Sequence, residues 1–151
     1  MIKPATCRYP QVDVCLFVCL LFFSCTLWGN VAQAMELIAH PSVTNKVVSV
    51  NEARSLFFMR KRAWSDDLPV TVFVLEDDSQ FHRDFSKQRL RLFPYRLRRV
   101  WDRHLYSATG RIPKTVRNMT EMIKRISSTP GAIGYADKEF IDEGVQVIEI
   151  R

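Results

Sequence analysis

The sequence predicts a single α/β domain of about four strands and four helices that follows an N-terminal export signal. Short runs rich in β-branched residues alternate with amphipathic stretches of helical period, and Pro and Gly separate the two kinds of segment. No internal repeat or long linker interrupts this pattern. A chain of 151 residues with 47% hydrophobic and 25% charged residues has ordinary globular composition, which excludes a disordered or fibrous protein and a large two-lobed enzyme.

Residues 1–34 have the pattern of a secretory signal peptide. An uncharged run, Val14–Trp28, follows a weakly basic start, and Ala32-Gln33-Ala34 supplies the small residues that a signal peptidase requires. A membrane-spanning helix needs about 20 apolar residues, so this run is short for a permanent anchor. We therefore expect cleavage after Ala34, a mature domain of residues 35–151 and a periplasmic location. The alternative is an anchor that is not cleaved.

Composition also restricts the chemistry of the mature domain. All cysteines precede the expected cleavage site, so thiol, disulfide and cysteine–metal chemistry are excluded from it: Cys7, Cys15, Cys19 and Cys25. The formal charge of the chain is +6. Behind an export signal, this basic balance favours small anions, anionic lipid or an acidic envelope protein over nucleic acid as partners.

Two strands and one helix are expected in the first part of the domain. Glu36–His40 is a short apolar run followed by Pro and Ser, which is typical of an opening strand. Ser49 stands three residues before Glu52 in a capping-box pattern, and the helix behind it has the apolar face Ala53, Leu56 and Phe57. Val70–Leu75 is rich in β-branched residues, which predicts a buried strand.

Three further helices are expected. The first begins at Asp77–Ser79 and carries Phe81 and Phe85 one turn apart. Pro94 opens the second, whose apolar stripe is Leu97, Val100, Trp101 and Leu105. The third has the clearest helical period of the chain, in Met119, Met122, Ile123 and Ile126. Asn118 either caps this third helix or accepts a glycan, because an Asn-Met-Thr sequon begins there.

Two strands close the domain after a break at Pro130-Gly131. They are expected at Ala132–Tyr135 and Val145–Ile150, both of which are short apolar runs. The large aromatic residues are interpreted as core or loop-anchoring groups: Trp64, Trp101 and Tyr135.

Two stretches resemble the phosphate-type periplasmic substrate-binding proteins of ABC transporters. Residues 56–72, L-F-F-M-R-K-R-A-W-S-D-D-L-P-V-T-V, resemble the helix, Trp, Asp-rich turn and strand of that family. Residues 129–135, T-P-G-A-I-G-Y, are similar to its Pro-Gly-Ala-Ile-Gly-Tyr motif. The resemblance covers the mature chain, and it implies a single lobe of the type 2 periplasmic-binding fold with phosphate or a related oxyanion as the ligand class.

The resemblance also implies a place for the anion. In the family, a Ser-Gly-Thr-like turn after a strand holds phosphate beneath an Arg, and the matching segment is Glu76–Gln80. A helix N-terminus offers N–H groups and a favourable dipole to an anion there. We therefore take five residues as candidate ligand-binding groups, of which Arg111 stands in a Gly-flanked loop: Ser42, Asp78, Ser79, Gln80 and Arg111.

The same segment predicts that the anion binds weakly. The position of the family's Arg holds Val74 or Leu75, and the turn carries three acids, Glu76, Asp77 and Asp78. The repulsion energy between one carboxylate and a unit negative charge about 4 Å away is about 4 kcal/mol at an effective dielectric of 20. A single lobe also leaves the ligand half exposed unless a second copy or another protein supplies the missing wall.

A basic region lies between residues 89 and 104 and has two interpretations. It contains Arg89, Arg91, Arg96, Arg98, Arg99, Arg103 and His104. These side chains form either a docking surface for an acidic partner or an anionic membrane, or simply a solvated helix face.

Catalytic and metal sites find no support in the sequence. The three His residues lack metal-site spacing, so neither a metal nor another cofactor is expected. Ser79, His82 and Asp84 have the residue types of a hydrolase triad, but they stand on one helix without a nucleophile elbow. We interpret them as a helix cap with surface polar residues, and the protein as a non-enzyme.

The function predicted first is that of an exported solute-binding-like protein, related to the phosphate-binding components of ABC transporters, that binds phosphate or a related oxyanion weakly. Its expected partners are that anion, an envelope membrane protein or sensor, and a second copy of the chain. The alternative is an envelope protein-interaction module that kept the fold after losing the ligand.

Overall fold

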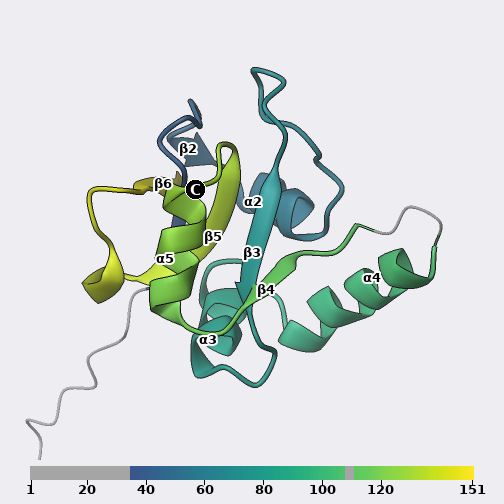
Figure 1. Cartoon of the computed structure of the whole chain (residues 1–151). Coiled ribbons are helices and arrows are strands. Elements are labelled where there is room, and N and C mark those ends of the chain that lie inside the picture. Colours follow the sequence, from purple (N-terminus) through teal and green to yellow (C-terminus); the bar gives the residue numbers. More distant parts are fainter. Residues whose placement is uncertain (1–34, 108–110) are drawn as a thin grey trace, which may run out of the picture. The chain divides into compact units, whose positions relative to one another are not determined.

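The predicted apolar runs form the central strands of a mixed sheet in the computed structural model, which describes residues 35–107 and 111–151 (Figure 1). These strands are β1 (Met35–Ala39), β3 (Thr71–Leu75), β5 (Ala132–Asp137) and β6 (Gln146–Ile150). Two short strands were not predicted, β2 (Val47–Val48) and β4 (Lys114–Val116). The predicted export signal and its cleavage site lie outside the described residues.

The strand order of the sheet is β2-β6-β1-β5-β3-β4. Strand β1 runs antiparallel to both β5 and β6, whereas β5, β3 and β4 run parallel to one another. Strands β5 and β3 pair only at Thr71 and Val72, opposite Ala132 and Ile133. The amide of Leu75, farther along β3, instead donates to the hydroxyl of Tyr135 at 2.9 Å.

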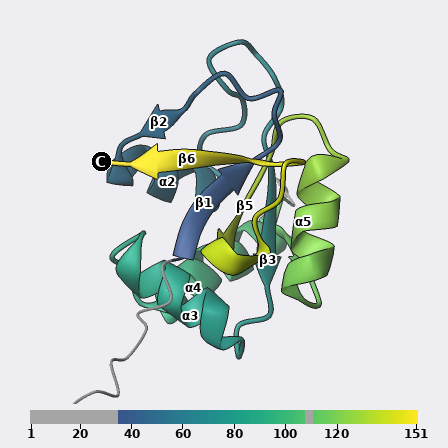
Figure 2. The same cartoon turned by 90° about the vertical axis from the view of Figure 1, so that its left-hand side faces the viewer.

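Helices cover both faces of the sheet (Figure 2). They are α2 (Val50–Phe57), α3 (Gln80–Gln88), α4 (Pro94–Tyr106), α5 (Met119–Ser127) and the 3₁₀ helix η2 (Lys138–Phe140). The ring of Tyr135 packs against Phe57 of α2 and Phe85 of α3. The neighbouring Gly134 has the α5 side chains Met122 and Ile126 at its Cα, on the opposite face. Among the described residues, no helix is long and apolar enough to cross a membrane.

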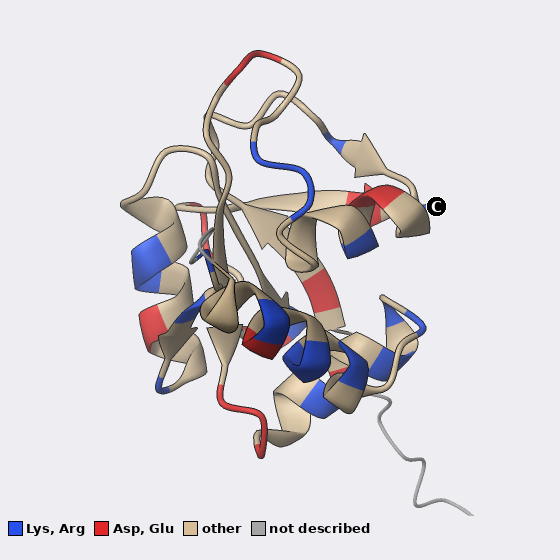
Figure 3. Ribbon diagram, turned by 90° about the vertical axis from the view of Figure 1, so that its right-hand side faces the viewer, with Lys and Arg blue, Asp and Glu red and all other residues tan. Residues whose placement is uncertain are grey.

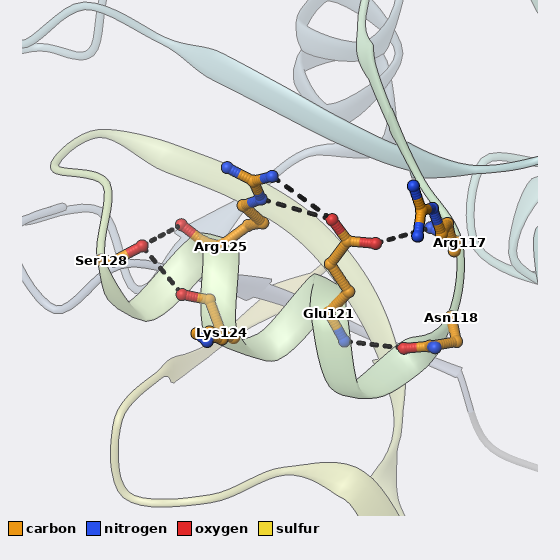
Figure 4. Close-up of polar contacts among 6 residues, drawn as sticks. All are labelled: Arg117, Asn118, Glu121, Lys124, Arg125 and Ser128. Carbon is orange, nitrogen blue, oxygen red and sulfur yellow. Dashed lines mark hydrogen bonds and ion pairs between the residues drawn. The ribbon is translucent and has the colours of Figure 1, made fainter.

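The predicted caps fix where α2 and α5 begin. The Ser49 hydroxyl accepts from the amide of Glu52 at 3.1 Å. Asn118 accepts from the amide of Glu121 at 2.9 Å, and the Glu121 carboxylate accepts from the amide of Arg117 at 3.1 Å (Figure 4). The last bond favours the ionised carboxylate and so lowers the pKa of Glu121. Asn118 is therefore a helix cap, as one of its two interpretations predicted.

The stripe predicted on α4 is partly wrong. Leu97 and Trp101 are buried, and the Trp101 indole donates to the carbonyl of Phe57 at 2.8 Å. Leu105 is 53% exposed, because it lies at the edge of the helix face that Leu97 and Trp101 turn toward the core. A stripe of four positions is wider than the narrow contact that α4 makes with the domain.

Gly131, in the Pro-Gly-Ala-Ile-Gly-Tyr-like motif, joins three loops. Its amide donates to the Ser42 hydroxyl at 3.1 Å, and its carbonyl accepts from the indole of Trp64 at 3.0 Å. Its φ of 72° and the Pro69 carbonyl oxygen, only 2.2 Å from where a Cβ would stand, leave room for glycine alone. The motif therefore has a structural role: its hydrogen bonds hold the start of β3 and β5 against the loop that follows β1.

Candidate functional site

The turn between β3 and α3 has the strand–turn–helix geometry that the sequence predicted. Glu76, Asp77 and Asp78 are exposed, and the amide of Ser79 donates to the carbonyl of Glu76 at 3.0 Å. Ser79 is the N-cap residue of α3, but its hydroxyl makes no bond to the helix. Ser79 is half-buried, and its hydroxyl leaves the first amides of α3 without a hydrogen bond from their N-cap side chain.

Arg83, which the sequence reasoning missed, places a cation at this turn. Its guanidinium contacts the carbonyl of Asp78 and donates to Oε1 of Gln80 at 2.9 Å. The Gln80 amide group in turn donates to Asp84 at 2.8 Å. Gln80 is thus engaged by its own helix. The spacing of three and four residues was the signal that could have revealed these contacts.

A cleft of about 380 Å³ opens beside the turn. The end of β3, the turn, α4 and the segment leading into β4 line it, with Trp101 and Ile112 among its apolar groups. Its charged side chains are four acids and one base: Glu76, Asp77, Asp78, Asp102 and Arg98. The cleft therefore carries an excess of negative charge.

Arg98 does not offset this excess for an incoming anion, because it is already paired. Its guanidinium lies 3.1 Å from the carboxylate of Asp102 and 3.5 Å from that of Asp77. Both pairs are roughly half exposed, so each holds Arg98 only loosely. A phosphate in the cleft would have to compete with two carboxylates for one cation.

The structure does not bring all five candidate residues together. Asp78, Ser79 and Gln80 are consecutive at the turn after β3. Ser42 lies at the opposite end of β3, since its hydroxyl bonds to His40 and to Gly131, just before β5 begins. A five-residue strand separates the two ends by roughly 16 Å. Arg111 is exposed and directly precedes Ile112 of the cleft wall, but it does not itself line the cleft.

His82 is buried, contrary to its interpretation as a surface residue. It is 1% exposed, and its Nδ1 lies 2.7 Å from the hydroxyl of Tyr135. That hydroxyl already accepts from the amide of Leu75, so we assign its proton to a bond with Nδ1. The other ring nitrogen, Nε2, then carries the ring proton and has no hydrogen-bond partner among the described residues.

Burial sets the protonation states of this pair. Loss of hydration lowers the pKa of His82; the nearby Arg83 lowers it further, and Asp77 partly opposes both effects. Burial likewise raises the pKa of the Tyr135 hydroxyl. Both groups are therefore neutral near pH 7.

The candidate triad residues are engaged separately. His82 bonds to Tyr135 inside the core, whereas Asp84 accepts from Gln80 at the surface. Across residues 35–107 and 111–151, no group of three or more His, Cys, Asp or Glu side chains is arranged to hold a metal ion.

The neutral, buried His82 should make stability depend on pH. Above its ordinary pKa of 6.5 the imidazole is neutral in both the folded and the unfolded chain. As the pH falls below 6.5, the unfolded chain takes up this proton first, so the free energy of unfolding should decrease. We expect urea unfolding to show a loss of at most about 1.4 kcal/mol for one pH unit below 6.5.

The matched variant is His82→Asn, which keeps an acceptor near the position of Nδ1 but cannot titrate. It should be less stable than the wild type at pH 7.5 yet lose less stability between about pH 7.5 and pH 5.5. An equal loss in the two proteins over this range would mean that His82 is not the titrating group.

This chain is similar to known proteins in its fold, but it matches no sequence family. No protein-family model and no curated protein matches the sequence. A phosphate ABC transporter substrate-binding protein with bound phosphate, from Clostridium perfringens, is 16% identical with a TM-score of 0.61 over 77% of this chain and 44% of its own. An ABC-type phosphate transport receptor from Vibrio cholerae is 11% identical with a TM-score of 0.60 over 77% of this chain and 45% of its own.

PstS from Borrelia burgdorferi is also similar, with 14% identity and a TM-score of 0.58 over 78% of this chain and 47% of its own. The chain thus spans less than half the length of each of these three proteins. At such low identity the likeness concerns the fold. The chain has the fold of one lobe of the phosphate ABC transporter substrate-binding proteins, as the sequence motifs predicted.

Proposed function

We propose that this chain is an exported, non-enzymatic solute-binding-like protein that binds phosphate or a related oxyanion weakly at the β3–α3 turn. The observation that carries the proposal is the position of Ser79. Its hydroxyl stands at the N-terminus of a nine-residue helix and is not used as a cap, and only the three acidic residues of the turn separate it from the buried strand β3. The fold shared with phosphate-binding proteins supports the same ligand class.

Weak rather than tight binding follows from the charges. An oxyanion at Ser79 would meet the α3 dipole and Arg83, which favour it, and the acids Glu76, Asp77 and Asp78, which oppose it. One lobe also leaves the anion in contact with water. We propose that a second copy of the chain, or an envelope membrane protein or sensor, supplies the opposite wall when binding becomes tight.

Calorimetric titration of the full chain with inorganic phosphate tests the proposed site. We expect saturable binding in the millimolar range, and about tenfold weaker binding by Ser79→Ala because a charge-assisted hydrogen bond is lost. Ser49→Ala is the matched control: this serine also starts a helix, but its hydroxyl already caps α2. It should lower stability by about 1 kcal/mol and leave phosphate binding unchanged.

A flat titration, or equal weakening in both serine variants, would contradict the phosphate site. The second candidate function would then apply, an envelope protein-interaction module that kept the fold without the ligand. One observation favours it: the cleft beside the turn holds four carboxylates, and its single guanidinium is paired with two of them.

Export to the periplasm is part of the proposed function and rests on residues 1–34. Mass spectrometry of the chain recovered from a periplasmic fraction should give the mass of a protein that begins at Met35. Recovery of the intact chain with the cytoplasmic membrane would instead indicate an anchor that is not cleaved, and recovery from the cytoplasm would contradict export.

A further inference from the structure

Helix α4 presents a basic and aromatic face to solvent. The helix has thirteen residues and buries Leu97 and Trp101. At about 100° per residue, the side opposite these two is formed by five residues within roughly a third of the circumference, which we call the outer face of α4: Tyr95, Arg96, Arg99, Arg103 and Tyr106. All five are exposed, and Lys and Arg mark much of the α4 ribbon (Figure 3).

The three arginines of the outer face lack an anionic partner. Arg98 binds Asp77 and Asp102 on the cleft side of the helix, but Arg96, Arg99 and Arg103 make no ion pair with any described residue. Because they are three and four residues apart, their charges repel one another and disfavour the helix. Arg103 in the last turn complements the helix dipole, but no carboxylate of a described residue offsets the repulsion among the three arginines, whereas an external anionic surface would.

Tyrosines stand at both ends of this basic stretch. Tyr95 is 59% exposed and Tyr106 is 89% exposed, and eleven residues of helix place them about 16 Å apart. Phe93, also 59% exposed, stacks on Tyr95 with ring centroids 5.9 Å apart. Exposed aromatic rings beside arginines are typical of helices that lie in the headgroup region of a bilayer, where tyrosine has both an apolar and a hydrated environment.

We propose that the outer face of α4 docks the protein on an anionic phospholipid surface. Guanidinium groups bind lipid phosphates through paired hydrogen bonds, and the rings of Tyr95 and Tyr106 enter the headgroup layer. The size of the face favours lipid over a protein partner. A helix of about 20 Å presents far less than the roughly 800 Å² per partner of a stable protein interface, whereas a bilayer needs no complementary shape.

Docking on lipid is independent of the proposed phosphate site. None of the five residues of the outer face lines the cleft, to which α4 contributes Arg98, Trp101, Asp102 and Leu105. Ser79→Ala should therefore leave membrane binding unchanged, and loss of the outer-face charges should leave phosphate binding unchanged.

Vesicle flotation of the full chain tests the proposal. The vesicles contain phosphatidylcholine alone or phosphatidylcholine with phosphatidylglycerol, and the variant is R96Q/R99Q/R103Q. Each arginine near an anionic leaflet raises the partition coefficient about fivefold, so the triple variant should bind the anionic vesicles about a hundredfold less well. Binding of the wild type should also weaken steeply with salt.

The matched control is R62Q/K124Q/K138Q, which removes the same charge from exposed positions elsewhere on the domain. Both triple variants keep residues 1–34, so any contribution of that segment is common to them. The control should retain nearly all of the wild-type binding, and thermal unfolding should show that both variants are folded.

Three outcomes would overturn the proposal. They are an equal loss of binding in the two triple variants, wild-type binding that does not depend on the anionic lipid, and unchanged binding in R96Q/R99Q/R103Q. Tyr95→Ser together with Tyr106→Ser supplies an independent measurement. This pair should weaken binding even at high salt, and unchanged binding would contradict the role of the rings.

Discussion

A single buried hydroxyl, that of Tyr135, holds together the part of the domain on which the candidate site depends. Strands β3 and β5 separate after Val72, which would leave the amide of Leu75 buried without a partner. The Tyr135 hydroxyl accepts from that amide and bonds to His82 of α3. Its ring also stacks on Phe85 at 4.2 Å. The end of β3 and the start of α3 are thereby fixed to β5, and the turn between them keeps its position.

At this turn the backbone arrangement favours an anion, whereas the charged side chains oppose one. The backbone offers a strand, a turn and a helix N-terminus, an arrangement suited to an anion. The side chains do not complete it. Val74 and Leu75, one of which stands where the resemblance would place the family's arginine, are apolar and buried, and Arg98 is shared between Asp77 and Asp102. The cleft beside the turn therefore carries an excess of acidic side chains, whereas three arginines without an ion-pair partner among the described residues lie on the outer face of α4.

Local features of the sequence were enough to predict most elements, but they could not predict contacts between residues that are far apart in the sequence. Ser49 and Asn118 marked helix starts because a cap needs only residues three positions apart. The strands β2 and β4, of two and three residues, have no pattern of their own and form through pairing with β6 and β3. The burial of His82 depends on Tyr135, 53 residues away, and the separation of Ser42 from Ser79 depends on the strand order.

Amide hydrogen exchange in Tyr135→Phe tests most directly whether this hydroxyl fixes the end of β3. The substitution removes one oxygen and keeps the ring that packs on Phe57 and Phe85. Because the amide of Leu75 loses its acceptor, its exchange should accelerate about tenfold more than exchange at the amides of β1, which β5 and β6 pair on both sides. Equal acceleration at Leu75 and in β1 would show that the hydroxyl does not hold the turn in place.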